Sequence, residues 1–247
     1  MTAPLTSFIL AVQFLTRLPT PQVPEFEPAA LSRASSFFPA VGFIVGAVLA
    51  LVLWAGSHID PWAGAVLTLG TWALITGALH LDGLSDLADA LGAAHADETR
   101  FHEVLKDPHI GTFGVVSLIV QLAAKLVLLM LVAEQEVFWV LIPLCAWARL
   151  GPLFWAHFLP ALRPPSAKTD GMGERFSWEI NPITPWAWAA LLLLSAWGAP
   201  AFLAAPFILL VWGAYLHLRL KGQTGDSLGA GIEVSESLLL LACVLFV

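Results

Sequence analysis

The chain of 247 residues is 58% hydrophobic and only 12% charged, whereas soluble domains carry about 25% charged residues. This composition excludes an ordinary soluble domain and predicts an integral membrane protein. Its many Trp and Phe side chains are expected to face lipid or the membrane interface, so no nucleic-acid partner is predicted.

The first predicted element is a helix over Ser7–Leu18, interpreted as amphipathic or re-entrant, which ends before Pro19. Apolar stretches that approach the roughly 20 residues needed to cross a bilayer follow it. They lie at about Pro39–Gly56, Trp62–His80, Thr112–Ala133, Val137–Leu159, Pro185–Trp197, Ala201–His217 and Ser227–Val247. We predict an all-α, polytopic membrane helical bundle of about seven transmembrane helices plus the N-terminal amphipathic helix, forming one catalytic domain over residues 1–247.

The basic residues indicate which side of the membrane each loop occupies. Most of them fall in four stretches that alternating spans place on one face: Arg17 and Arg33; Arg100 and Lys106; Arg163, Lys168 and Arg175; Arg219 and Lys221. The positive-inside rule makes that face cytoplasmic. We therefore expect a multi-pass protein of a bacterial or archaeal cytoplasmic (inner) membrane, with its polar motifs facing the cytoplasm. A homo-oligomer is left open.

Three carboxylates mark the segment after the second span. Asp82, Asp86 and Asp89 are spaced i, i+4 and i+7, which places them within roughly 60° of one helix face. They repel one another by about 2–3 kcal/mol per neighbouring pair, and no Lys or Arg occurs between residues 78 and 99 to compensate. A bound Mg²⁺ would relieve this repulsion and indicate phosphate chemistry; a solvated acidic face is the alternative.

Two residues beside these aspartates bear on the same site. Gly83 would let a phosphate or another backbone approach closely. His80 either orients a carboxylate or binds substrate, or it is an interfacial histidine with a satisfied hydrogen bond.

Two further motifs carry polar residues next to glycines. Lys106 and Asp107 precede the sequence GTFG at the start of a predicted helix, where backbone N–H groups favour anions. The sequence TGDSLGAGIEVSE, over Thr224–Glu236, contains Asp226, Glu233 and Glu236. An ordinary loop-to-helix junction and a solvated helix entry are the respective alternatives.

Two cations lie deep in predicted spans, where charge is costly and usually faces a polar cavity. They are Lys125 and Arg149. Either they hold substrate phosphates, or they pair with buried acids; Arg149 alone has the further option of reaching the interface.

Six motifs, in the same order along the chain, resemble the cobalamin synthase family. They are FLTRLP (Phe14–Pro19), FFPAVG (Phe37–Gly42), LHLDGLSDLADALG (Leu79–Gly92), KDPHIGTFG (Lys106–Gly114), GMGERF (Gly171–Phe176) and TGDSLGAGIEVSE (Thr224–Glu236). The resemblance implies an adenosylcobinamide-GDP ribazoletransferase. Such an enzyme joins adenosylcobinamide-GDP to α-ribazole or its 5′-phosphate, releases GMP, and forms adenosylcobalamin or its 5′-phosphate in a reaction that requires Mg²⁺.

The resemblance also implies residue roles. Metal binding is assigned to Asp82, Asp86 and Asp89. The candidates for the general base or a second metal site are Asp107, Asp226 and Glu233. Independently of the resemblance, the residues themselves offer as candidates for substrate binding His80, Lys106, Lys125, Arg149, Thr224 and Gly225.

Two alternatives to this family remain at the level of sequence. A CDP-alcohol phosphotransferase would also use spaced aspartates at the membrane surface, but the later pair of aspartates that this class carries is missing. An ion-coupled transporter would explain Lys125 and Arg149. It would not explain why the acidic motifs gather on one face.

Overall fold

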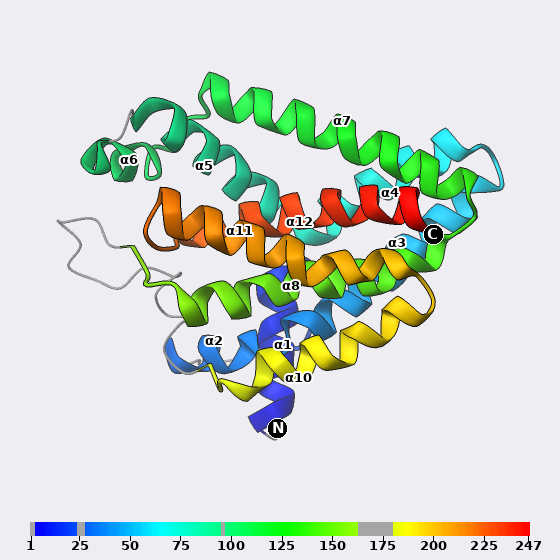
Figure 1. Ribbon diagram of the computed structural model, residues 1–247, viewed down its shortest axis with the longest axis horizontal. Helices are drawn as coiled ribbons and strands as arrows, with labels where there is room; N and C mark the ends of the chain where they lie inside the picture. Colours follow the sequence, from blue (N-terminus) through cyan, green and yellow to red (C-terminus); the bar gives the residue numbers. More distant parts are fainter. Residues whose placement is uncertain (1–2, 24–27, 95–96, 163–179) are drawn as a thin grey trace.

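The computed structural model describes residues 3–23, 28–94, 97–162 and 180–247. Within these ranges the chain is helical, with one isolated bridge between Ala161 and Gln223 and no strand. In Figure 1 the long helices run side by side along the long axis, and α1 crosses them. The predicted basic stretch with Arg163, Lys168 and Arg175, and the motif over Gly171–Phe176, lie outside the described residues.

The helices in chain order are α1 (Ala3–Leu15), α2 (Pro28–Ser35), α3 (Phe38–Ser57), α4 (Pro61–Thr76), α5 (Leu79–Ala94), α6 (Glu98–Val104), α7 (Thr112–Glu134), η1 (Phe138–Val140), α8 (Leu141–Phe158), α10 (Ile183–Leu193), η2 (Leu194–Trp197), η3 (Pro200–Ala204), α11 (Ala205–Arg219) and α12 (Gly225–Phe246).

The all-α membrane bundle is confirmed, with fewer full spans than expected. Among the described residues, five helices are long and apolar enough to cross a membrane, or six if the bent pair α4 and α5 counts as one span. The predicted span Pro185–Trp197 corresponds to the shorter apolar helix Ile183–Trp197. The N-terminal helix is present as α1, with Leu10, Ala11 and Leu15 buried.

A sharp bend separates α4 from α5, within the sequence that was expected to span the membrane up to His80. Gly77 and Ala78 both adopt left-handed backbone angles, with φ of 60° and 57°. Glycine takes this conformation freely, whereas alanine pays about 1–2 kcal/mol. The two helices therefore meet at 85°, and the acidic helix α5 packs against α7 and α12.

Glycines allow the closest helix contacts. A Cβ atom on Gly42 or Gly46 would overlap the backbone of α8, so this pair, four residues apart, lets α3 and α8 approach as small residues do in membrane bundles.

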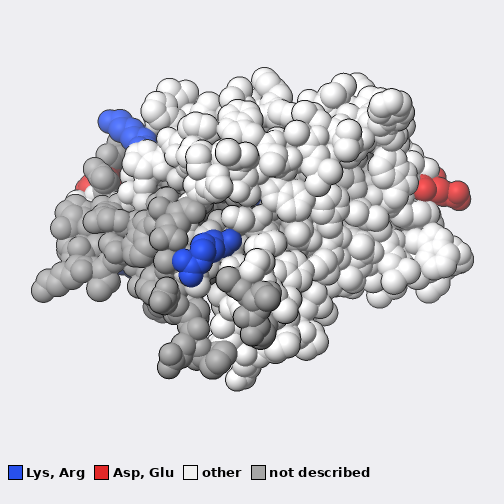
Figure 2. Space-filling model, turned by 90° about the horizontal axis from the view of Figure 1, so that it is seen from below, with Lys and Arg blue, Asp and Glu red and all other residues white. Residues whose placement is uncertain are grey.

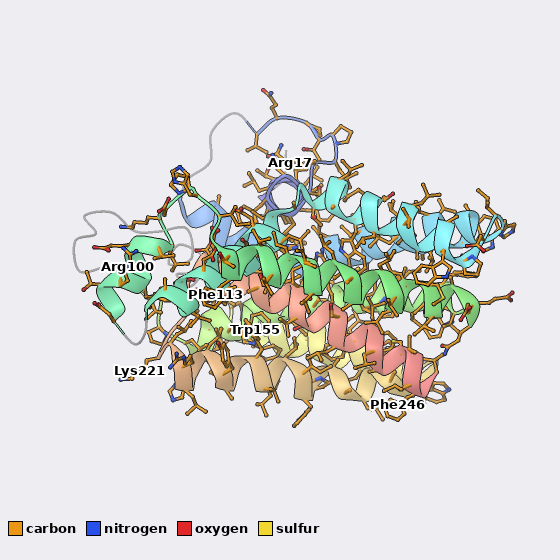
Figure 3. The ribbon with its side chains drawn as sticks, turned by 90° about the horizontal axis from the view of Figure 1, so that it is seen from above. Arg17, Arg100, Phe113, Trp155, Lys221 and Phe246 are labelled. Carbon is orange, nitrogen blue, oxygen red and sulfur yellow. The ribbon has the colours of Figure 1, made fainter. Side chains whose placement is uncertain are left out.

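The surface matches a protein in lipid. Large apolar side chains are exposed on several long helices, among them Ile119 on α7, Leu210 on α11 and Leu74 on α4. Most of the described surface visible in Figure 2 carries neither basic nor acidic side chains. In Figure 3, Arg100 and Lys221 lie at one end of the bundle and Phe246 lies at the opposite end.

Candidate active site between α5 and α12

The start of α12 lies directly against α5. A Cβ atom on Gly83 would stand 2.9 Å from the carbonyl oxygen of Asp226, and one on Gly229 would stand 3.5 Å from the Cα atom of His80. A Cβ atom on Gly229 would make an ordinary van der Waals contact, whereas the absence of a side chain at Gly83 lets the two backbones touch. This contact brings Asp226 to the acidic helix, and it explains why a glycine stands beside Asp82.

A cavity of about 110 Å³ opens at this contact, and we call it the α5–α12 cavity. Its polar lining comes from α5 and α12, with Ser35 from α2, and includes four of the residues that the sequence singled out: His80, Asp82, Gly225 and Asp226. The apolar lining comes mainly from α1, α3, α8 and α12: Phe14, Leu15, Phe38, Leu79, Pro152, Ile180, Leu228 and Ile232. The structure therefore joins two motifs that lie far apart in the chain.

The carboxylates at this site have no basic partner among the residues that the structure places. Asp82 is exposed and Asp86 is half-buried. Asp82, Asp226 and Asp89 all lie close enough to Asp86 to repel its charge. Of the ion pairs formed by described residues, none involves these four aspartates.

This donor set suits a hard cation that brings ligands of its own. In the part of the chain that the structure describes, no three His, Cys, Asp or Glu side chains are placed to hold a metal ion by themselves. Mg²⁺ is commonly bound through one or two carboxylates, with waters and substrate phosphates in its other positions. The neighbouring carboxylates Asp82 and Asp86 fit that pattern, whereas a closed protein cage does not.

Asp89 has a structural contact that the sequence did not reveal. Its Oδ2 accepts a hydrogen bond from the Gly111 N–H at 2.7 Å, and its Oδ1 accepts one from the Gly114 N–H at 2.8 Å. The side chain thus caps the N-terminus of α7 from a neighbouring helix, where a negative charge is also favoured. Its assignment as a metal ligand stays a prediction, and its observed partners are backbone groups.

We expect Asp89→Ala to lower the stability of the protein even without Mg²⁺. The change removes two hydrogen bonds to a charged acceptor, and losing a helix cap costs about 0.5–2 kcal/mol. Thermal unfolding in detergent with EDTA measures the effect, and Asp86→Ala is the matched control. Equal melting temperatures for Asp89→Ala and the wild type would show that the cap contributes nothing.

Four buried charges form a second polar centre, which we call the buried ion cluster: Lys125, Arg149, Glu233 and Glu236. Lys125 Nζ lies 2.7 Å from Glu233 Oε2 and also contacts Glu236 Oε2, while Arg149 Nη1 lies 2.8 Å from Glu236 Oε1. The four side chains are at most 4% exposed. Two cations therefore balance two carboxylates across α7, α8 and α12.

Neutral partners complete this cluster. Gln121 donates through Nε2 to Glu233 Oε2 at 2.9 Å, and Lys125 Nζ lies 4.2 Å from the centre of the Trp72 ring. Sequence analysis did not single out Gln121 or Trp72. The depth of Lys125 and Arg149 in their spans was the available signal, but it did not name their partners.

The cluster shows the partners that one of the two alternatives for these cations requires. Lys125 and Arg149 pair with buried acids, and Glu233 is one of those acids. Roles for Lys125 and Arg149 in substrate binding, and for Glu233 in catalysis, stay predictions. None of the three lines the α5–α12 cavity.

The other candidate site residues lie at the edges of the α5–α12 cavity or outside it. Thr224 is the N-cap of α12 and accepts from the Ser227 N–H at 3.1 Å, which is a structural role. Lys106 and Asp107 are exposed on the loop before α7. Asp107 Oδ1 lies 2.7 Å from His109 Nδ1 and accepts from the His109 N–H, and these hydrogen bonds hold the pKa of Asp107 below its usual value.

Comparison with known proteins places this arrangement in a family. The chain is 52% identical over 240 residues to the adenosylcobinamide-GDP ribazoletransferase of Laribacter hongkongensis, covering 96% of each chain. It is 51% identical over 239 residues to the protein of that name from Thiobacillus denitrificans, covering 94% of this chain and 92% of the relative. No solved structure matches significantly. The family model described as cobalamin-5-phosphate synthase matches residues 7–244, and the chain belongs to that family.

Proposed function

We propose that this chain is an adenosylcobinamide-GDP ribazoletransferase. The proposal is carried by one observation: Asp82 on α5 and Asp226 on α12 line the same cavity, and neither forms an ion pair with a basic residue that the structure describes. The names of the relatives supply the two substrates. A hydroxyl oxygen of α-ribazole, or of its 5′-phosphate, bonds to the phosphorus that carries the cobinamide, and the bond from that phosphorus to the oxygen of GMP breaks.

Asp82 and Asp86 are the residues that would hold Mg²⁺ in this proposal, and Asp226 lies beside them. When bound, Mg²⁺ neutralises charge on the pyrophosphate. The three carboxylates also repel one another, so the protein gains electrostatic stabilisation when a cation binds. That gain orders the carboxylates around the place where the phosphates arrive.

Asp226 is the best placed of the three candidate bases. It lines the cavity, whereas Glu233 is ion-paired in the buried cluster and Asp107 is on an exposed loop. We assign to Asp226 the acceptance of the proton from the attacking hydroxyl. The proton then leaves to solvent, to which the Asp226 side chain is partly open.

The charges support a cytoplasmic active site. Arg100 and Lys221 lie at one end of the bundle. The connections from α3 to α4 and from α7 to α8 lie at the other end of the bundle (Figure 1). They carry the acidic residues Asp60, Glu134 and Glu136, and no Lys or Arg. By the positive-inside rule, the basic end lies on the cytoplasmic side of a bacterial or archaeal inner membrane.

The function is tested by GMP release from the purified protein in detergent or liposomes. We expect release only when adenosylcobinamide-GDP, α-ribazole or its 5′-phosphate, and Mg²⁺ are all present, with loss on adding EDTA. Omitting each component in turn is the control. Transfer from a CDP-alcohol without corrinoid, or ion-driven uptake into liposomes without GMP release, would replace the proposal with one of the two alternatives.

A further inference from the structure

Most of the α5–α12 cavity has no use in phosphate chemistry. Its carboxylates stand on one side, but the remaining wall is apolar, built from side chains such as Phe14, Leu15 and Phe38 of α1 and α3. Pyrophosphate and ribose gain nothing from such a wall, because burying them there would leave their oxygens without hydrogen bonds. The wall therefore suits an apolar group attached to the reacting part of a substrate.

Two buried polar residues interrupt this wall, Ser35 and His80, and the Ser35 hydroxyl already donates to the Ser32 carbonyl at 2.6 Å. His80 lines the cavity and is 2% exposed, and neither of its ring nitrogens has a hydrogen-bond partner in the part of the chain that the structure describes. An unsatisfied buried polar group costs about 1–3 kcal/mol, so its persistence calls for a partner that is present only with substrate. An imidazole at the wall of an apolar cavity can recognise a single ring nitrogen of a flat heterocycle.

On the basis of the function proposed above, we infer that this cavity seats the aromatic base of the ribazole acceptor, with His80 bonded to the free ring nitrogen. The base of a ribazole is a flat bicycle that is apolar apart from that nitrogen. Its ribose would then extend toward Asp82 and Asp226. The attacking hydroxyl is thereby placed next to Asp226, the proposed base, and Asp82, which would hold the cation.

Other parts of the substrates fit the cavity less well. The guanine base of the donor carries polar groups along several edges, and one imidazole beside an apolar wall would leave most of them unpaired. The corrin ring is far larger than a cavity of about 110 Å³. The guanine base and the corrin ring would therefore bind outside the cavity.

Filling the cavity tests the inference. Leu228→Phe places a larger side chain in the apolar wall, and we expect the KM for α-ribazole to rise at least about tenfold, with the KM for adenosylcobinamide-GDP within about twofold of wild type. The matched control is Leu238→Phe, on the same helix but 41% exposed, which should change neither constant. Gly229→Ala is a second, smaller filling, because its Cβ would make only ordinary contacts.

The role of His80 is tested with two small probes that differ by one ring nitrogen. We expect 1-methylbenzimidazole to compete with α-ribazole at least about tenfold better than 1-methylindole does, and we expect His80→Leu to abolish this preference. Benzimidazole competing with adenosylcobinamide-GDP instead, or an unchanged KM for α-ribazole in both filled variants, would overturn the inference while GMP release stands. A wild-type protein that releases no GMP would overturn the proposed function itself.

Discussion

Asp82→Asn is expected to lower the rate of GMP release by about 10²–10⁴-fold at saturating substrates. The substitution keeps the size of the side chain but removes a negative charge from the group that would bind Mg²⁺, and single contributions of this kind are worth about that factor. Because Asp82 is exposed and forms no ion pair with a described residue, the variant should fold normally. Asp82 therefore offers a clean separation of activity from stability.

The measurement is single-turnover GMP release over a range of Mg²⁺ concentrations. Glu134→Gln is the matched control, because it removes a carboxylate exposed at the C-terminal end of α7, in the loop opposite the basic end. If Asp82 helps to bind the cation, the variant should also need more Mg²⁺ for half-maximal rate. Activity within threefold of wild type, at unchanged Mg²⁺ demand, would rule out the proposed role of Asp82.

Glu236→Ala is expected to destabilise the folded protein by about 3–5 kcal/mol, the usual cost of removing one partner from a buried ion pair. Both Lys125 and Arg149 contact this carboxylate, which is fully buried. Its loss leaves two buried cations facing Glu233 alone. The Nε and Nη2 atoms of Arg149 already lack partners among the described residues, and the remaining acceptor of this side chain is the neutral Cys145 carbonyl, 3.0 Å from Nη1.

The effect is read from the yield of monodisperse protein and from thermal unfolding in detergent. A double variant, Glu236→Gln with Arg149→Met, removes one charge of each sign and leaves Lys125 paired with Glu233. It should therefore be more stable than Glu236→Gln alone, and the double-mutant cycle measures the coupling. If Glu236→Gln and Arg149→Met each melted at the wild-type temperature, the cluster would not be what holds the helices together.

Several elements could be predicted from the sequence because their signal is local. The bounds of α3, α7, α8 and α12 agree with the apolar stretches within a few residues, since about 20 consecutive apolar residues suffice to define a span. The shared face of Asp82, Asp86 and Asp89 followed from helical periodicity alone.

The bend between α4 and α5 was not predictable in the same way. Gly77 was a visible candidate for a helix end, but Ala78 also takes a left-handed conformation, which its side chain disfavours. Packing of α5 against α7 and α12 holds it there. Consequently the predicted span ending at His80 stops at Thr76, and the acidic helix turns away from it.

Composition, hydropathy and motif order thus determined by themselves that this is a helical membrane protein of the cobalamin synthase type. The tertiary structure alone decided how its charges divide: Asp82 and Asp226 meet at the cavity, Asp89 caps α7, and Lys125 neutralises Glu233. Periodicity reports which face of a helix a residue occupies, but not which neighbouring helix covers that face. A charge becomes a ligand, a cap or an ion pair according to that neighbour, because the partner and the exposure to water set its electrostatic energy.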